Sequence, residues 1–130
     1  MWFWWFMFIS DLLIPLVMIV GGMLMWKHTP KKINGIYGYR TSRSMKNLDT
    51  WTFAHRYIGR LWWVIGWIIL AHTVLANLPF VGKSDDAISV VSTVVLIVQM
   101  LILVATVIPT ERALKRAFDE NGVRRSEGTK

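Results

Sequence analysis

The chain has 130 residues, 54% of them hydrophobic, and a formal net charge of +7. This length has room for one domain, and the absence of cysteine excludes disulfides, thiol catalysis and cysteine-bound metal. Because the basic residues flank long apolar runs, the charge favours an anionic membrane face as partner and disfavours nucleic acid.

The first apolar run covers residues 2–26 and predicts a transmembrane helix. At about 1.5 Å per residue, it is longer than the roughly 30 Å hydrocarbon core of a bilayer. Asp11 is its only ionisable residue, and Pro15 follows one turn later. A signal peptide is disfavoured, because no basic region precedes the run and no Ala-x-Ala-like site follows it.

Residues 27–60 form a polar, basic loop whose two halves differ. Its first half lacks helical periodicity, and Asn34-Gly35 is a turn signal. From Asn47 onward, apolar residues recur every three or four positions, which predicts an amphipathic helix at the membrane surface. One interpretation is that this helix anchors and angles the second span. The other is a binding platform built from Tyr37, Tyr39, Arg40, Arg43 and Trp51.

Two further apolar runs, at about residues 61–80 and 88–108, predict the second and third spans. Eight lysines and arginines lie in residues 27–60, one lies in 81–87, and six lie in 110–130. Because basic residues mark the cytoplasmic side, we expect the N-terminus outside, and the first loop and the C-terminus in the cytoplasm. The predicted fold is all-α: an integral membrane bundle of three transmembrane helices, with an amphipathic cytoplasmic helix leading into the second span.

The residues after the third span are expected to form a short amphipathic helix over 110–118, with Glu111 paired to Lys115. Asn121-Gly122 should end this helix. We therefore expect a single membrane domain over residues 1–122 and a disordered basic tail over residues 123–130.

Among the polar residues inside the predicted spans, Asp11, His72 and Gln99 lie one on each span. A charged residue in a span costs roughly 2.5–3.5 kcal/mol on insertion scales. Counted along their helices, the three residues reach similar depths of about 12–16 Å, so we expect a cluster in which Asp11 accepts from His72 with Gln99 nearby. Three interpretations stay open: structural glue between helices, a proton-coupled or ligand-binding pocket, and an aspartate that extends towards the outer interface.

Sites for metals and catalysis find little support. Neither His28 nor His55 has a further ligand at a suitable spacing, and we expect no metal and no cofactor. No nucleophile or phosphate-binding motif occurs, so an enzyme is not expected. An enzyme acting on lipid head groups at the inner interface stays as an alternative, and self-association into a homo-oligomer stays open.

The stretch KKINGIYGYRTSRSMKNLDTWTFAHRYIGRLWW, residues 31–63, resembles the signature of the SdpI family of small bacterial membrane proteins. The matching positions are Asn34, Gly35, Gly38, Tyr39, Arg40, Thr41, Ser44, Met45, Lys46, Asn47, Thr50, Trp51, Ala54, His55 and Gly59. The match covers about a quarter of the chain, and the segment TERALKRAFDENG adds looser support. A run of this length is far more specific than a short motif.

The resemblance implies a bacterial cell-membrane protein of an immunity or resistance type. The family is named for a multipass protein that protects cells producing a membrane-active peptide toxin and that also tethers a transcriptional repressor. This chain resembles the shared domain of the family without the extra spans of that longer protein. By resemblance, the chain would bind either a peptide toxin or a cytoplasmic repressor-like partner, with membrane lipids around it. The residues to test first are Tyr39, Arg40, Arg43, Trp51 and His55. The main alternative from the residues themselves is a small proton-coupled transporter that uses Asp11 and His72.

Overall fold

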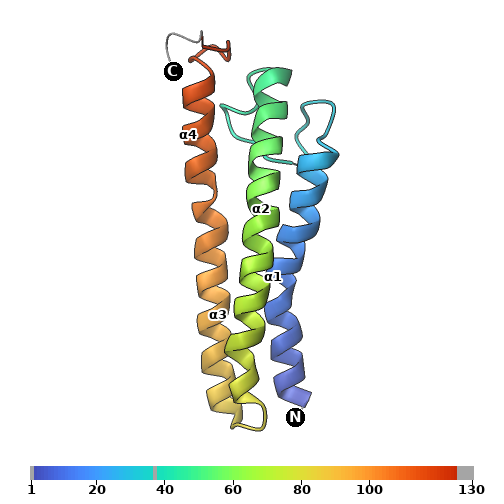
Figure 1. Cartoon of the computed structure of the whole chain (residues 1–130), viewed down its shortest axis with the longest axis vertical. Helices are drawn as coiled ribbons and strands as arrows, with labels where there is room; N and C mark the ends of the chain where they lie inside the picture. The colour runs from blue at the N-terminus through green and yellow to red at the C-terminus, as the bar shows by residue number, and fades with distance from the viewer. Residues whose placement is uncertain (1, 37, 126–130) are drawn as a thin grey trace.

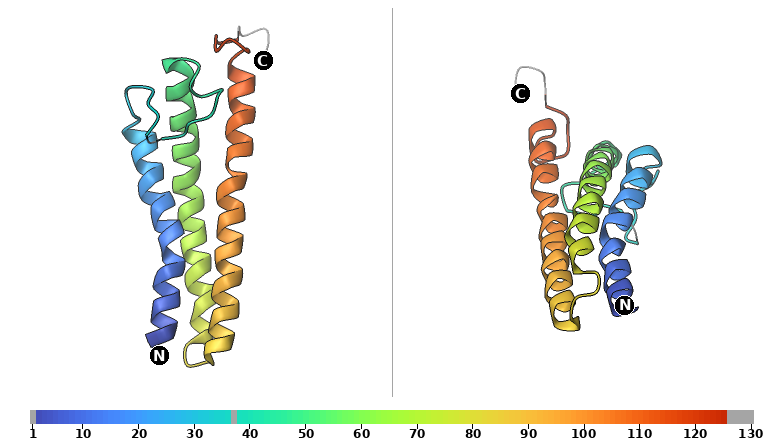
Figure 2. Two further views of the ribbon diagram at one scale, coloured as in Figure 1. Left: turned by 180° about the vertical axis from the view of Figure 1, so that it is seen from behind. Right: turned by 60° about the horizontal axis from the view of Figure 1, so that its bottom comes forward.

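The computed structural model describes residues 2–36 and 38–125, which form an elongated bundle of helices (Figure 1). The elements in chain order are α1 (Trp2–Lys27), α2 (Leu48–Asn77), the 3-10 turn η1 (Leu78–Phe80), α3 (Asp85–Ala105) and α4 (Val107–Ala117). In the views of Figures 1 and 2, α2 lies between α1 and the nearly continuous rod of α3 and α4. Along the shaft α1 also packs directly against α3, where Asp11 contacts Ser92 and Gln99. Three stretches of helix are long and apolar enough to cross a membrane, which confirms the predicted fold class.

The second helix is one unbroken α-helix of 30 residues. The amphipathic segment predicted from Asn47 runs straight into the second span without a separate surface helix. At about 45 Å, α2 is longer than a bilayer core, so its first turns extend beyond the apolar part of the bundle. The helix gives way to η1 at Leu78, where Pro79 follows, and Gly82 turns the chain with a φ of +79°.

Helix α3 ends at Ala105 and α4 begins two residues later, so the apolar stretch that could cross a membrane, Asp85–Ala117, is interrupted near the predicted end of the third span. Pro109 explains the interruption, because it has no N–H to offer the carbonyl of Ala105. Thr106 occupies the break, and its hydroxyl accepts a hydrogen bond of 2.9 Å from Trp62 Nε1 on α2. The break between α3 and α4 therefore lies against α2, and α4 continues beside the first turns of α2.

Glycines allow α1 and α2 to touch along their backbones. A Cβ added at Gly22 would lie 2.6 Å from the carbonyl oxygen of Gly59, and one added at Gly66 would lie 3.1 Å from the backbone nitrogen of Ile19. Only residues without a side chain fit such a contact. These glycines therefore set the distance between the first two helices within a single chain.

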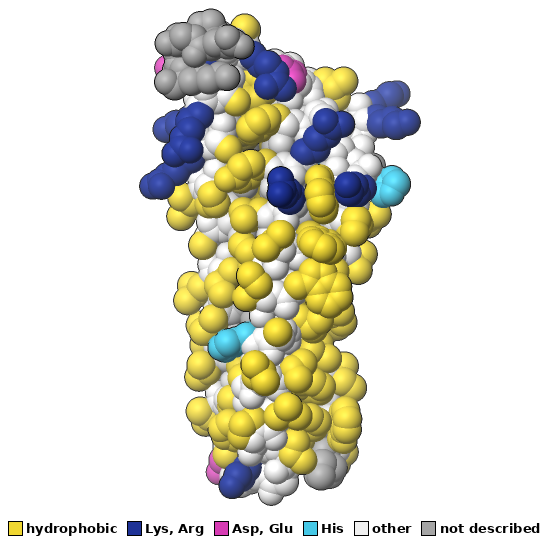
Figure 3. All heavy atoms as spheres, in the orientation of Figure 1, with side chains coloured by type: hydrophobic (Ala, Val, Ile, Leu, Met, Phe, Trp, Pro, Cys, Tyr) yellow, Lys and Arg dark blue, Asp and Glu magenta, His cyan; other side chains and the backbone are white. Residues whose placement is uncertain are grey.

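The surface divides into an apolar shaft and a basic end, which we call the loop end: residues 28–56, together with α4 and residues 118–125. In Figure 3, hydrophobic side chains cover most of the visible shaft, and lysine and arginine gather at the loop end. Many large apolar side chains on the three helices are exposed, including Leu13, Ile68 and Leu101. Lipid tails would cover such side chains, as expected for a membrane protein.

The C-terminal segment is more ordered than predicted. Phe118 is buried, Asn47 Nδ2 donates to the carbonyl of Gly122 at 2.7 Å, and Arg124 makes a two-bond contact with Asp49 at 2.8 Å each. The expectation of disorder from residue 123 is therefore wrong for residues 123–125. Residues 126–130 lie outside the described residues, so the rest of that expectation stays a prediction.

Candidate functional site

The loop between α1 and α2 is folded around the imidazole of His55, which is fully buried. The backbone N–H of Tyr39 donates to His55 Nε2 at 2.8 Å, and His55 Nδ1 lies 2.8 Å from the carbonyl oxygen of Trp51. Nε2 accepts and Nδ1 donates, so the ring is neutral with both nitrogens engaged. Gly38 makes this approach possible, because its φ is +106° and a Cβ there would collide with His55 Nε2.

Polar side chains close the second half of the loop onto the start of α2. Asn47 and Thr50 form a capping box, in which Asn47 Oδ1 accepts from the Thr50 N–H and Thr50 Oγ1 accepts from the Asn47 N–H. The hydroxyl of the buried Ser44 donates to the carbonyl of Tyr39 at 2.9 Å and accepts from the N–H of Thr41 at 2.9 Å. The helix start predicted at Asn47 is confirmed, and the signature residues around it act as its cap.

The first half of the loop is tied down in the same way. Trp51 is fully buried, and its Nε1 donates to the carbonyl of Pro30 at 2.9 Å. Arg40 donates to the carbonyl of Gly35, and Asn34 Oδ1 accepts a backbone N–H two residues further on at 3.0 Å. The predicted turn at Asn34-Gly35 is therefore closed by the side chains of two signature residues.

Glu111 on α4 joins the loop to the C-terminal helix. Its Oε2 accepts from the Tyr39 hydroxyl at 2.6 Å and from Thr41 Oγ1 at 3.1 Å, and its Oε1 lies 3.9 Å from Arg43 Nε. Burial, followed by the hydrogen bond to this carboxylate, raises the pKa of Tyr39 well above its usual value. Glu111 was predicted to pair with Lys115, but its carboxylate instead contacts the loop between α1 and α2. The only signal for it in the sequence was the looser likeness of the tail to the family.

Two aromatic members of the predicted binding platform do not offer the surface that this interpretation needs. Tyr39 and Trp51 are buried, and their polar atoms bind other parts of the fold, so they offer no aromatic surface. Tyr37 lies outside the described residues. The charged members of the predicted site stay accessible: Arg40 and Lys46 are exposed, and Arg43 is partly exposed.

A polar hollow of about 490 Å³ opens between the signature loop and α4. Its lining combines two basic residues, two carboxylates and two hydroxyl groups, from Thr41, Ser42, Arg43, Lys46, Glu111 and Glu120. Glu111 contacts two of these lining side chains, Thr41 by a hydrogen bond and Arg43 by an ion pair. Such a surface can contact a polar or charged segment of a partner.

The buried polar centre of the three spans forms around Asp11, which is 2% exposed. Ser92 Oγ lies 2.8 Å from each oxygen of the Asp11 carboxyl group, and Asn77 Nδ2 lies 3.4 Å from Oδ2. Gln99 Nε2 donates to Thr73 Oγ1 at 2.8 Å. Two buried oxygens in the described residues, Asn77 Oδ1 and Gln99 Oε1, have no hydrogen-bond partner.

The predicted meeting of Asp11 and Gln99 is confirmed, but the prediction for His72 is wrong. His72 is exposed on the lipid-facing side of α2, and its neighbour Thr73 faces inwards. Gln99 Nε2 also donates to the backbone carbonyl of Asp11 at 2.9 Å. That carbonyl would have bonded the N–H of residue 15, which is a proline and has none. The amide of Gln99 therefore replaces a hydrogen bond that Pro15 removes.

Comparisons with known proteins converge on one family. A model of the SdpI/YfhL protein family matches residues 31–110. YfhL of Bacillus subtilis (strain 168), an uncharacterized protein, is 33% identical over 114 residues, which is 85% of this chain and 90% of that protein. No solved structure matches the chain.

Proposed function

The chain belongs to the SdpI/YfhL protein family, and on that premise we propose that it confers resistance to a membrane-active peptide by binding. The contact surface in this proposal is the polar hollow at the loop end, with Arg43 and Lys46 as its basic side chains. The loop end lies in the cytoplasm, because fourteen of the fifteen lysines and arginines belong to residues 27–60 and 110–130.

One observation carries the proposal: the signature residues build an internally hydrogen-bonded loop that presents a few accessible side chains. His55, Ser44 and Trp51 use their polar atoms inside the fold, which favours a positioning role over a reactive one. A folded loop that presents its basic side chains in one region loses less conformational freedom when a partner binds than a disordered loop would. A binding surface needs this order, so we favour binding over turnover of a lipid head group.

The test is survival of cells that express the protein when they are challenged with a panel of membrane-active peptides. We expect wild type to protect, and Arg43→Ala with Lys46→Ala to lose protection at unchanged protein level. The matched control is Lys31→Ala with Lys32→Ala, because both lysines are exposed in the same loop but do not line the hollow. Equal survival of the two double variants would count against the hollow.

A second experiment separates the two kinds of partner. Purified protein in liposomes is challenged with the same peptide while leakage of a trapped dye is followed. Protection in liposomes supports direct sequestration of the peptide. Protection in cells without protection in liposomes supports a cytoplasmic partner, such as a repressor-like protein held at the loop end.

Proton handling at the polar centre is the second candidate, and it is favoured by the two unpaired amide oxygens beside Asp11. The centre is formed with Asn77, Ser92 and Gln99, and not with His72. Under this candidate, Asp11→Asn abolishes proton flux into liposomes measured with a trapped pH dye. Ser10→Ala, on the adjacent residue whose hydroxyl bonds only its own helix, serves as the control. Flux that is absent from wild-type protein would remove this candidate.

A further inference from the structure

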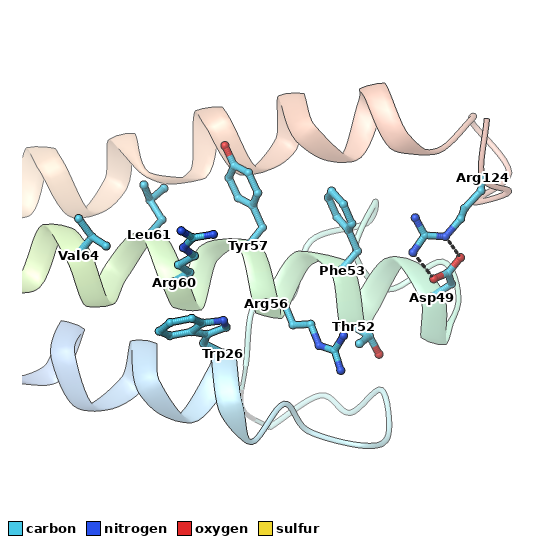
Figure 4. A pocket seen from close by; sticks show the side chains of 10 residues that line it. All are labelled: Trp26, Asp49, Thr52, Phe53, Arg56, Tyr57, Arg60, Leu61, Val64 and Arg124. Atoms are coloured by element: carbon cyan, nitrogen blue, oxygen red, sulfur yellow. Dashed lines mark hydrogen bonds and ion pairs between the residues drawn. The ribbon is translucent and has the colours of Figure 1, made fainter. Parts of the chain in front are cut away.

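A second hollow, which we call the arginine groove, lies on the side of α2 near the end of α1. It has a volume of about 610 Å³ and is lined mainly by α2 (Figure 4). Arg56, Arg60 and Val64 follow one another at steps of four residues, so they form one stripe along the helix. Tyr57 and Leu61 form the neighbouring stripe. Both stripes change from polar to apolar in the same direction, towards the shaft.

Two of the three arginines that line this groove, Arg56 and Arg60, carry charge that the described part of the chain does not neutralise. Among the described residues, the ion pairs are Arg43 with Glu111 and Arg124 with Asp49, so neither Arg56 nor Arg60 has a carboxylate within 4.0 Å. Asp49 lines the same groove, but Arg124 holds both of its oxygens. The groove therefore presents an uncompensated double positive charge.

An interfacial tryptophan closes the groove on the side of α1. The guanidinium carbon of Arg60 lies 6.0 Å from the centre of the Trp26 ring, and Lys27 Nζ lies 4.1 Å from the same ring. Figure 4 shows Trp26 beside Arg60, with Leu61 and Val64 further along the helix. Tryptophan is enriched where head groups meet acyl chains. The depth of the groove in the membrane thus matches its change in polarity.

We propose that the arginine groove binds one anionic phospholipid of the surrounding leaflet. The phosphate and the rest of the head group lie along the stripe formed by Arg56 and Arg60, whose planar groups suit phosphate oxygens. The upper part of an acyl chain lies against Leu61 and Val64. A lipid fits better than a peptide segment, because the charge and the apolar contact are separated along the bundle axis as they are in a lipid. This site is independent of the hollow proposed for the peptide or cytoplasmic partner.

The probe is a mixture of phosphatidylcholine and phosphatidylglycerol in which the full chain is reconstituted. Lipids that stay bound after gentle extraction are counted by native mass spectrometry. We expect wild type to retain phosphatidylglycerol in preference to phosphatidylcholine. Neutralising two arginines at a membrane surface should weaken the binding of phosphatidylglycerol roughly tenfold or more. Arg56→Gln with Arg60→Gln should therefore lose the preference.

The matched control is Arg112→Gln with Arg116→Gln, which neutralises two exposed arginines at the same spacing on α4, outside the groove. Far-UV circular dichroism of each variant shows that the fold is kept, which is expected because all four side chains are exposed. A control that retains the preference supports the groove. An equal loss in both double variants would overturn the site in favour of general attraction. Wild type without any preference, or a site that an acidic amphipathic peptide fills while phosphatidylglycerol does not, would overturn it too.

Discussion

The contact between α1 and α2 leads to a sharp prediction for Gly22→Ala. The new methyl carbon would lie 2.6 Å from the carbonyl oxygen of Gly59 and 2.7 Å from the backbone nitrogen of Trp63. Ordinary contact begins at 3.4 Å, so the helices would have to separate by about 0.8 Å. Because both neighbours are backbone atoms, no side chain can rotate to make room.

The preceding residue provides the matched control. A Cβ at Gly21 would lie 3.7 Å from the ring of Trp62, which is ordinary contact. Both substitutions gain the same helix propensity, up to about 1 kcal/mol, so this gain cancels when the two variants are compared. Overpacking costs roughly 1–3 kcal/mol. We therefore expect Gly22→Ala to unfold more easily than Gly21→Ala by about that amount.

The assay is unfolding in mild detergent by increasing mole fractions of sodium dodecyl sulfate, followed by far-UV circular dichroism. The free energies of unfolding of wild type and both variants are compared at one reference composition. Equal stability of the two variants would refute the reasoning, because it would mean that the helices are not held apart by the backbone contact at Gly22.

Three further predictions concern the loop end. Glu111→Gln should lower the free energy of unfolding by about 1–3 kcal/mol and speed tryptic cleavage of the loop, because the hydroxyl of Tyr39 loses a carboxylate acceptor. The control is Glu120→Gln, at an exposed side chain, which should change neither quantity. Since its pKa is raised above 10.0, Tyr39 should stay protonated in the folded protein as pH passes that value. Its contribution to stability should be complete below pH 10.0 and decline as pH rises from there through the raised pKa. In an alkaline absorbance titration, Tyr39→Phe should therefore leave the tyrosinate step near pH 10.0 unchanged, and a smaller step would contradict the burial of this hydroxyl. Arg124→Gln should cost less than about 1 kcal/mol in the same unfolding assay, because its ion pair with Asp49 is exposed; a larger loss would show that the C-terminal segment holds the loop.

The three helices and the depth of the polar centre were predictable because both depend on distance along the chain. Long apolar runs fix the spans, and counting along them brings Asp11 and Gln99 to one level. The rotation of each helix about its axis was not predictable. One residue turns a helix by about 100°, and a span that is apolar all round gives no preferred face. Thr73 therefore faces the interior in place of His72, and Asn77 is the residue of α2 that donates to Asp11.

The role of the signature was harder to predict than its position. Tyrosine, tryptophan, histidine and arginine suggest a ligand site, but the same groups can hydrogen-bond distant parts of the chain. Trp51 binds the carbonyl of Pro30, 21 residues away, and Tyr39 binds Glu111, 72 residues away. Such partners cannot be read from local spacing. The position of the ordered loop was therefore predictable from the sequence. That most of the signature residues build the loop itself was not.

The bond from Gln99 to the backbone of Asp11 bears on how the protein is made. Before α3 has been synthesised, the carbonyl of Asp11 lacks both the N–H that Pro15 cannot supply and the amide of Gln99. The emerging third helix meets a hairpin that already holds both acceptors for its amide, on Asp11 and on Thr73. Gln99, whose amide satisfies the carbonyl of Asp11, is thus synthesised after both of its acceptors. A nascent chain halted before residue 99 should therefore be recognised by membrane quality control.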